Sequence, residues 1–354
     1  MSLLEDRYRH VLRLLPASYR AEREEEMVCA FVEGAGGLSD ADNPRPRWSE
    51  IASVAALSVR VRLGGVGAAP RFLAWGDAVR LVAVLGLFFH AAVSCVWLLS
   101  LLRFYGAADQ AALGGTESAR RLWDIVQTLG YLLWISAFAS LVRGHPRIAK
   151  ILALLALALF YSPILQGGSA FRSENLVYGF LFAVPVLSLM AGFHRDAPRA
   201  RHPRWTAVLP VVVGVPLYAI MNVLSSLGMA RTIDWRLWSW VWPWLDTSGL
   251  ACLALLVASA FLFGTRPWAP GGGRGPALPL ALAILSVPVL LAHVSHLTFD
   301  AVDPATRTMA AVNIGQLVAV LLCGLALTGL AVRAMPALPP VPPPFPSDQR
   351  PEDR

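Results

Sequence analysis

The 354-residue chain is 56% hydrophobic and 15% charged, and its mean hydropathy is +0.55. These values leave too few charged side chains to cover a soluble globule of this size, so they predict a membrane protein. The formal net charge of +7 does not indicate a nucleic-acid partner, because the basic residues concentrate in short loops beside apolar segments and so mark membrane orientation. The four cysteines are widely separated and predict neither a disulfide framework nor a metal site.

Residues 1–63 are predicted to form a small cytoplasmic module of three helices, with a linker at 34–47. Apolar residues recur along one face of the first helix: Leu4, Tyr8, Val11, Leu12 and Leu15. Pro16 is expected to end this helix, and further helices are expected over 18–32 and 49–63. The first two helices carry more acidic than basic residues, which favours contact with protein over attachment to anionic lipid.

The segment LRLLPASYRAEREEEMVCAF, residues 12–31, resembles the N-terminal helical module of HAAS-type membrane proteins and the prefix of certain bacterial permeases. The matching residues run from a Leu-Pro turn to a terminal aromatic: Leu15, Pro16, Arg20, Glu22, Glu25, Glu26, Met27 and Phe31. The resemblance implies a regulatory or signalling role, often associated with PadR-type transcription regulators. Within this segment we select Arg20, Glu25 and Phe31 as candidate residues for docking a cytoplasmic partner.

A juxtamembrane linker at 64–78 is expected to lead into eight transmembrane helices within residues 79–331. Spanning a bilayer takes about 20 apolar residues. Stretches of suitable length occur at 79–102, 122–142, 148–165, 176–193, 206–229, 246–264, 277–297 and 309–331, of which the third and fourth are short. The predicted fold class is therefore all-α, a polytopic membrane helical bundle with a small N-terminal cytoplasmic helical module.

The segments that connect the predicted spans lie alternately on the two sides of the membrane, and arginine and lysine are more frequent in those on one side. Positively charged loops are retained in the cytoplasm, so that side is the cytoplasmic one. The distribution predicts a multi-pass protein of the bacterial plasma membrane with both termini inside the cell. No signal peptide is expected, because charge alternates with leucine through the first 33 residues. The tail, residues 332–354, is rich in proline and is expected to be disordered and cytoplasmic.

Few polar residues fall inside the predicted spans. Among them, the amides Gln127, Asn222, Asn313 and Gln316 are expected to form hydrogen bonds between helices. The pair His293 and His296 shares a helix face, and Asp300 follows close by. These three residues could bind a ligand or sense pH, or the histidines could serve only as interfacial hydrogen-bonding groups. The signature HExxH is missing, so no metal site is predicted.

Five tryptophans crowd into the segment between the fifth and sixth predicted spans: Trp235, Trp238, Trp240, Trp242 and Trp244. Tryptophan prefers the headgroup layer, so the segment is interpreted as a membrane-surface anchor. The alternative is an aromatic platform for a lipid, a hydrophobic drug or a cationic ligand. Pro243 is expected to end or kink the segment.

No phosphate loop, dinucleotide fingerprint or nucleophile elbow occurs, so neither an enzyme nor a cofactor is predicted. The favoured function is sensing or regulation, in which the spans respond to an envelope or lipophilic signal and the N-terminal module passes it to a cytoplasmic partner. The alternative is a transporter or permease component without its own ATPase. The predicted partners are membrane lipids and a cytoplasmic regulatory protein or transporter subunit.

Overall fold

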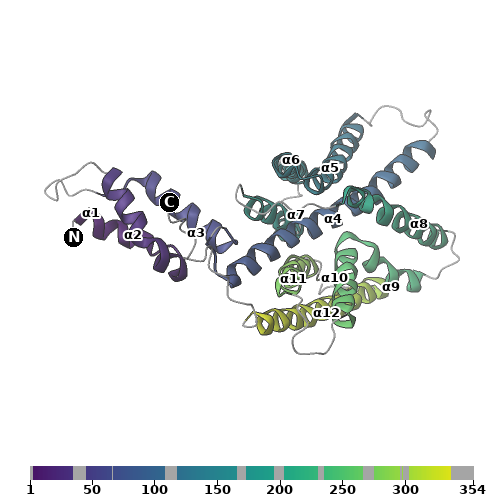
Figure 1. Cartoon of the computed structure of the whole chain (residues 1–354). Coiled ribbons are helices and arrows are strands. Elements are labelled where there is room, and N and C mark those ends of the chain that lie inside the picture. The colour runs from purple at the N-terminus through teal and green to yellow at the C-terminus, as the bar shows by residue number, and fades with distance from the viewer. Residues whose placement is uncertain are drawn as a thin grey trace. The chain divides into compact units, whose positions relative to one another are not determined.

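The computed structural model describes residues 3–34, 45–65, 67–107, 118–165, 173–194, 203–229, 235–265, 275–295, 297 and 303–335. All secondary-structure elements formed by these residues are helices, which confirms the predicted all-α class (Figure 1). In chain order the helices are α1 (Leu3–Leu12), α2 (Ala17–Gly34), α3 (Trp48–Arg62), α4 (Pro70–Ala107), α5 (Ser118–Val142), α6 (Pro146–Leu165), α7 (Ser173–Gly192), the 3₁₀ segment η3 (Arg204–Val208), α8 (Leu209–Met229), α9 (Trp235–Leu245), α10 (Thr247–Gly264), α11 (Ala277–Ser295) and α12 (Pro304–Ala334).

The chain divides into two compact units. We call the described residues up to Asp77 the N-terminal unit, and Ala78–Ala331 the membrane unit. The helix α4 begins in the N-terminal unit and continues into the membrane unit. Within the linker predicted at 64–78, residues 70–78 are helical and form the first turns of α4. Proline is well placed in the first turn of a helix, so Pro70 starts α4, and no later residue before the span stops it.

The N-terminal unit is built around one apolar core. Its buried members come from all three predicted helices and the turn after them: Tyr8, Leu12, Leu15, Tyr19, Val28, Val54, Val61 and Ala68. The side chain of Phe72, at the start of α4, packs against this core. Within α1 the predicted apolar face is confirmed, because Leu4, Tyr8 and Leu12 are buried. The helix ends at Leu12, and α2 starts directly after Pro16.

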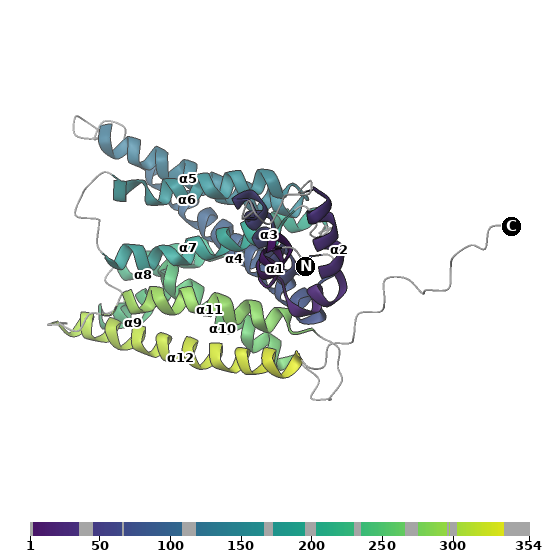
Figure 2. The ribbon, with the colours of Figure 1, turned by 90° about the vertical axis from the view of Figure 1, so that its left-hand side faces the viewer.

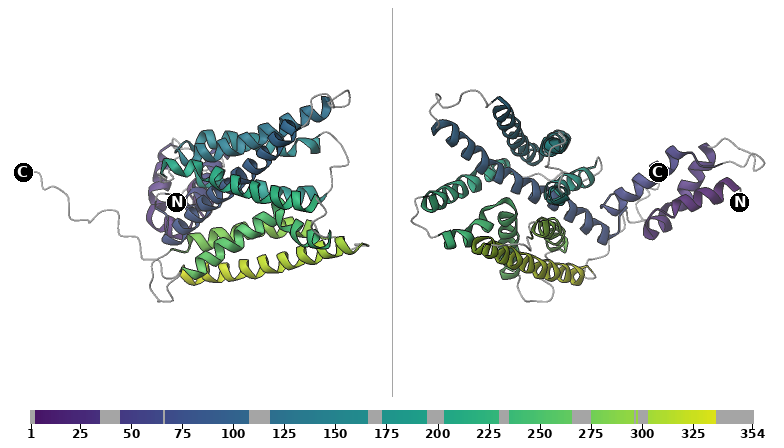
Figure 3. Two further views of the ribbon diagram at one scale, coloured as in Figure 1. Left: turned by 90° about the vertical axis from the view of Figure 1, so that its right-hand side faces the viewer. Right: turned by 180° about the vertical axis from the view of Figure 1, so that it is seen from behind.

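All eight predicted spans coincide with helices of the membrane unit, which run side by side in Figures 2 and 3. Six helical segments in the described part of the chain are long and apolar enough to cross a membrane: Pro70–Tyr105, Asp124–Val142, Trp205–Ser226, Thr247–Gly264, Ala277–Ser295 and Pro304–Ala334. The third and fourth predicted spans lie in α6 and α7, which are not among these six. The chain is thus a multi-pass helical membrane protein by length and composition, and a count of eight stays a prediction.

The helix α7 lies between the two apolar cores of the membrane unit. One core is formed around α4 to α7 and includes Leu189 of α7, while the other includes Leu181 of α7 together with residues of α10, α11 and α12. The ring of Phe182 packs against both cores. At Gly86, α4 approaches α7 so closely that a Cβ atom would overlap the ring of Pro185. Small residues allow such close approach between membrane helices, where dispersion contacts replace the hydrophobic effect.

Candidate functional site

The N-terminal unit is fixed to the first turns of α4 by backbone packing. A Cβ atom on Gly76 would overlap the carbonyl oxygen of Leu63, so only glycine fits where α4 passes the end of α3. On the other side of the unit, the Ser58 hydroxyl donates to the Leu14 carbonyl at 2.6 Å, and Arg62 donates to the same oxygen at 3.1 Å. The end of α3 at Leu63 is thus packed directly against α4 at Gly76.

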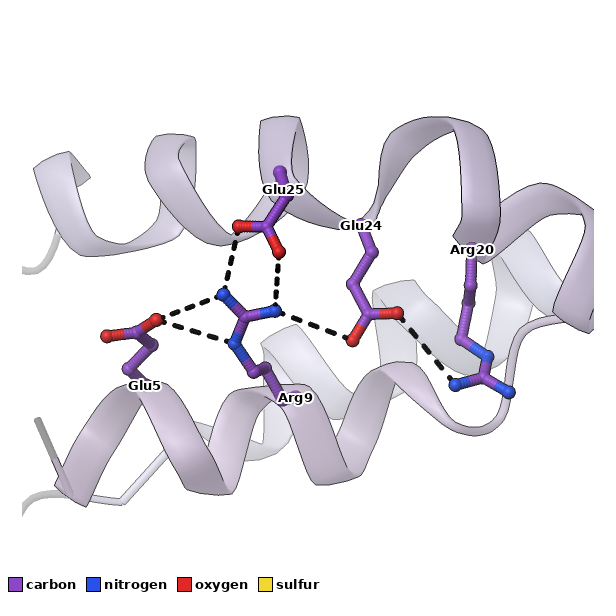
Figure 4. A network of polar contacts seen from close by, with 5 residues as sticks. All are labelled: Glu5, Arg9, Arg20, Glu24 and Glu25. Atoms are coloured by element: carbon purple, nitrogen blue, oxygen red, sulfur yellow. Dashed lines mark hydrogen bonds and ion pairs between the residues drawn. The ribbon is translucent and has the colours of Figure 1, made fainter. Parts of the chain in front are cut away.

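A cluster of charged residues joins α1 to α2 (Figure 4). The Arg9 guanidinium donates to both carboxylate oxygens of Glu25, at 2.8 and 2.9 Å, and to Glu5 at 3.1 Å. Glu24 lies 3.8 Å from both Arg9 and Arg20. We call these five residues the Arg9 cluster. Bidentate Arg–carboxylate pairs fix geometry well, but exposed pairs contribute little free energy, so the cluster sets the register of α1 against α2.

The charges in the Arg9 cluster shift one another's proton affinity. The hydrogen bond from Arg9 lowers the pKa of the Glu25 carboxyl, and the bonds to Glu25 and Glu5 raise the pKa of Arg9. Nearby, burial raises the pKa of the Tyr8 phenol, and the charge of Glu50 on α3 raises it further. Both shifts favour the charged forms of Arg9 and Glu25 at neutral pH.

The three predicted docking residues all take part in contacts within the unit. Arg20 lies 3.8 Å from Glu24. Glu25 binds Arg9 while its side chain stays 77% exposed. The Phe31 ring stacks on Tyr8 with centroids 3.9 Å apart and planes 7° from parallel. Changing these residues would alter the unit itself, and docking through them stays a prediction.

The outward face of α3 was missed by the sequence interpretation. Trp48 is 84% exposed and Val59 is 54% exposed. Ala52 and Ala56 lie between them at helical spacing and are also exposed. The sequence does place apolar residues at spacings of 4, 4 and 3 along this face, as expected for a helical stripe. Two of the four are alanines, which are too small to mark an apolar face clearly. This stripe, Trp48 to Val59, is an apolar surface of the N-terminal unit that no described side chain of that unit's core covers.

In the membrane unit a chain of buried polar groups links α11, α12 and α9. The His293 ring places Nδ1 2.8 Å from the Val289 carbonyl and Nε2 3.1 Å from Oε1 of Gln316. The Gln316 amide nitrogen in turn donates to the Pro243 carbonyl at 3.1 Å. His293 and Gln316 are each 1% exposed. The expected interhelical hydrogen bonding is therefore confirmed for Gln316, whereas Gln127 accepts from Tyr131 of its own helix, and the expectation for Asn222 and Asn313 stays a prediction.

The predicted set of His293, His296 and Asp300 is only partly visible. His293 is buried as described, whereas His296 and Asp300 lie outside the described residues. Across the described part of the chain, no group of three or more His, Cys, Asp or Glu residues could hold a metal ion. The sequence could not indicate that the Pro243 carbonyl accepts from Gln316. Every residue has a backbone carbonyl, so residue type does not mark this acceptor.

The tryptophan-rich segment is a helix, α9. The described tryptophans differ in their exposure and packing, and an aromatic platform stays a prediction. Trp240 and Trp242 are exposed by 58% and 43%, whereas Trp244 packs against the core shared by α10, α11 and α12. Trp238 is half-buried and lies 5.7 Å from the Trp242 ring, and the side chain of Trp235 lies outside the described residues. The helix thus buries Ser239, Pro243 and Leu245 and leaves Trp240 and Trp242 exposed.

A second buried histidine has a different environment. The His90 ring is 2% exposed and has Nε2 3.1 Å from the Leu181 carbonyl. It stacks on Phe182 with centroids 4.6 Å apart and lies 4.8 Å from the Trp134 ring. His90 therefore contacts a single acceptor oxygen among aromatic rings, whereas His293 lies between two.

Comparison with known proteins adds no relative. No protein-family model, curated protein or solved structure matches this chain. The resemblance of residues 12–31 to HAAS-type and permease-prefix modules therefore stays a prediction that depends on those residues alone.

Proposed function

We propose that this chain is a regulatory protein of the bacterial plasma membrane, with both termini in the cytoplasm. In this proposal a conformational change of the membrane unit alters the N-terminal unit, which binds a cytoplasmic protein. The coarser part of this statement, a multi-pass helical membrane protein, follows from the six long apolar helices. The finer part is supported by the contacts of α4.

The observation that carries the proposal is that α4 belongs to both units. Its residues 70–77 lie in the N-terminal unit, and the same helix continues through the membrane unit. Phe72 packs into the N-terminal core, and Gly76 contacts the backbone of Leu63. Because one helix runs through both units, a shift or rotation of α4 in the bilayer would displace the first turns that pack into the N-terminal core.

The decisive experiment interrupts α4 without changing either unit. A heptad of Gly and Ser inserted between Asp77 and Ala78 would break the helix, whereas a heptad of alanines would continue it with a phase drift of only about 20°. Each protein is placed in nanodiscs with thin or thick lipid tails, which changes hydrophobic mismatch at the long helices. Amide hydrogen exchange is then followed in residues 3–65.

We expect the wild type and the alanine insert to change their exchange in the N-terminal unit when the bilayer thickness changes. The Gly-Ser insert should lose this response while the exchange in α10 and α11 still responds. An equal response from both inserts would contradict transmission through α4.

The proposed cytoplasmic partner is tested separately on the exposed stripe of α3. The variant Trp48→Ser/Val59→Ser changes exposed side chains only, so the core of the unit stays intact. Chemical cross-linking of the full-length protein in native membranes should lose a cytoplasmic protein in this variant. The matched control is Glu22→Gln/Glu26→Gln on the exposed side of α2, which should retain that protein. Loss in both variants, or in neither, would contradict docking on this stripe.

A further inference from the structure

We propose that helix α8 pairs with α8 of a second copy of this chain in the same membrane. The two helices run parallel and meet along a seam that contains Asn222. This pairing is independent of the regulatory function proposed above. Three features of α8 support it: the exposure of the helix, the spacing of its exposed side chains, and an amide without a partner in the described part of the chain.

The helix α8 is the least buried of the six long apolar helices. Only 11% of the residues in its apolar segment are buried, whereas the next lowest share is 22%, in α12. The helix lies at the periphery of the membrane unit (Figures 1 and 3). It is attached to α4 at Gly214, where a Cβ atom would lie only 2.8 Å from the Ala92 carbonyl oxygen. Most of the surface of α8 is therefore left to lipid or to another membrane helix.

One stripe of α8, which we call the seam, has the spacing of a helix pair. Its members recur at intervals of three, four, three and four residues: Val212, Val215, Ala219, Asn222 and Ser226. This period of 3.5 residues keeps a stripe facing its neighbour when two helices wind around each other with a left-handed twist. Val212 is 59% exposed and Val215 is 45% exposed, and Ala219 and Ser226 are exposed as well. The small side chains of Ala219 and Ser226 allow two membrane helices to approach closely.

The amide of Asn222 has no partner within the described part of the chain. Its side chain is half-buried, and no described residue donates a hydrogen bond to it or accepts one from it. Asn222 belongs to the apolar segment Trp205–Ser226, and the nearest charged residues in the sequence on either side are Arg204 and Arg231. Lipid tails offer neither a donor nor an acceptor, so an amide that faces them stays unpaired, at a cost in free energy.

A second copy of the chain supplies the partner that lipid lacks. An asparagine amide carries both donors and an acceptor, so it is complementary to a second asparagine amide. The distribution of basic residues orients every copy alike in the membrane. A two-fold axis along the membrane normal then places Asn222 of both copies at the same depth, facing each other across the axis. A single asparagine in a heptad seam also fixes the register of two parallel helices. The second copy is therefore the occupant that satisfies Asn222.

Two measurements on the purified full chain in lipid vesicles test the pairing. The first is oxidation by copper phenanthroline of a single added cysteine, in a Cys29→Ser background that removes the exposed native thiol. Val215→Cys lies in the seam. Val213→Cys is the matched control, because Val213 is 42% exposed and points about 160° away from Val215 around the helix. The second measurement counts fluorescent labels per particle by single-molecule photobleaching over a series of protein-to-lipid ratios, which gives the dissociation constant of the dimer.

We expect Val215→Cys to form a disulfide-linked dimer, because a disulfide needs Cα atoms within about 7 Å of each other. Val213→Cys and the Cys29→Ser background alone should stay monomeric on denaturing gels. Asn222→Val should weaken the dimer by about three- to tenfold, the range of interhelical hydrogen bonds in membranes. Ile220→Val changes an exposed side chain of the same helix outside the seam and should leave the dissociation constant unchanged.

Monomers of the wild type at every protein-to-lipid ratio would overturn the pairing, and would mean that lipid or a different protein covers the seam. Equal cross-linking from residues 213 and 215 would also overturn it, because the contact would then not follow the seam. A dimer of Asn222→Val as tight as that of the wild type would contradict the role of the amide. The photobleaching of the wild type decides the first point even if a variant failed to fold.

Discussion

In the N-terminal unit the large side chains of Tyr8, Leu12 and Val54 are buried, and the charged residues of α1 and α2 lie at the surface. In the membrane unit the arrangement is reversed. Leu187, Val257 and Phe261 are more than half exposed, while His90, His293 and Gln316 are buried and hydrogen-bonded. The same secondary structure is thus stabilised by two different sets of forces.

The difference follows from the solvent. Burying apolar area in water contributes about 25 cal/mol per Å², so one shared core can hold three short helices together. Lipid tails are as apolar as leucine, so membrane helices gain little from burying leucine and depend on close packing and internal hydrogen bonds. In this chain that packing occurs at Gly86 and Pro185, and the hydrogen bonds occur around Gln316.

The largest expected effect tests the core of the N-terminal unit. Leu12→Ala removes a side chain that is 0% exposed and should destabilise that unit by about 2–5 kcal/mol. The matched change in the membrane unit is Leu189→Ala, at a site that is also 0% exposed. It should cost less, because no transfer from water accompanies its burial. Free energies of opening from hydrogen exchange of the full chain measure both, and an equal loss would remove the distinction between the units.

The second prediction concerns close packing in the membrane unit. Gly86→Ala places a Cβ atom against the ring of Pro185, which is rigid, so we expect destabilisation by about 1–3 kcal/mol. Gly130→Ala in α5 is the control, because a Cβ atom there meets nothing within 4 Å. Thermal denaturation followed by size-exclusion chromatography compares the two variants. A similar shift for both would show that helix propensity, and not the approach of α4 to α7, determines the result.

A smaller effect is expected at Lys150 on α6. Its ammonium group donates to the carbonyls of Met190 and Phe193, at 3.0 and 2.9 Å, and so satisfies the end of α7. Lys150→Met should cost about 1 kcal/mol and speed amide exchange near the end of α7. Lys150→Arg keeps donors at this position and should retain most of the protection. Unchanged exchange in the methionine variant would show that these bonds do not hold α7.

The smallest effect is electrostatic and belongs to the Arg9 cluster. Arg9 holds the pKa of the Glu25 carboxyl below its ordinary value of 4.5. A carboxyl with a lower pKa in the folded state stabilises the fold above pH 4.5, and this contribution is lost as the pH falls through the lowered value.

Arg9→Gln should therefore raise the Glu25 pKa towards 4.5, as measured by carboxyl carbon NMR of the full chain. Glu22→Gln removes an exposed carboxylate from the same helix without touching the pair and should leave the Glu25 titration unchanged. If the Arg9 variant also left it unchanged, the guanidinium would not be the cause of the shift.

Much of the helical layout was predictable because long apolar runs and a helical period are properties of local sequence. Each predicted span coincides with a helix, and the face of α1 that carries Tyr8 and Leu12 is buried. The helix α9 escaped prediction because tryptophans and Pro243 dominate its sequence, and neither gives a helical period. The start of α4 was set too late because hydropathy marks the lipid-crossing part of a helix and not its first turns.

The candidate sites were less predictable, since they depend on groups far apart in the chain. Sequence reasoning placed His293 and Gln316 inside spans but had no means of pairing them or of finding the Pro243 carbonyl. It also selected Glu25 and Phe31 for docking a partner without indicating their contacts with Arg9 and Tyr8.

By itself the sequence determined that this chain is helical, that its long apolar segments suit a bilayer and which face of α1 is buried, because composition and period act within a single helix. Only the tertiary structure decided what covers each face: Leu63 at Gly76, Pro185 at Gly86, and Gln316 at His293. A period of 3.6 residues specifies the direction in which a side chain points, but the neighbour that meets it comes from another helix.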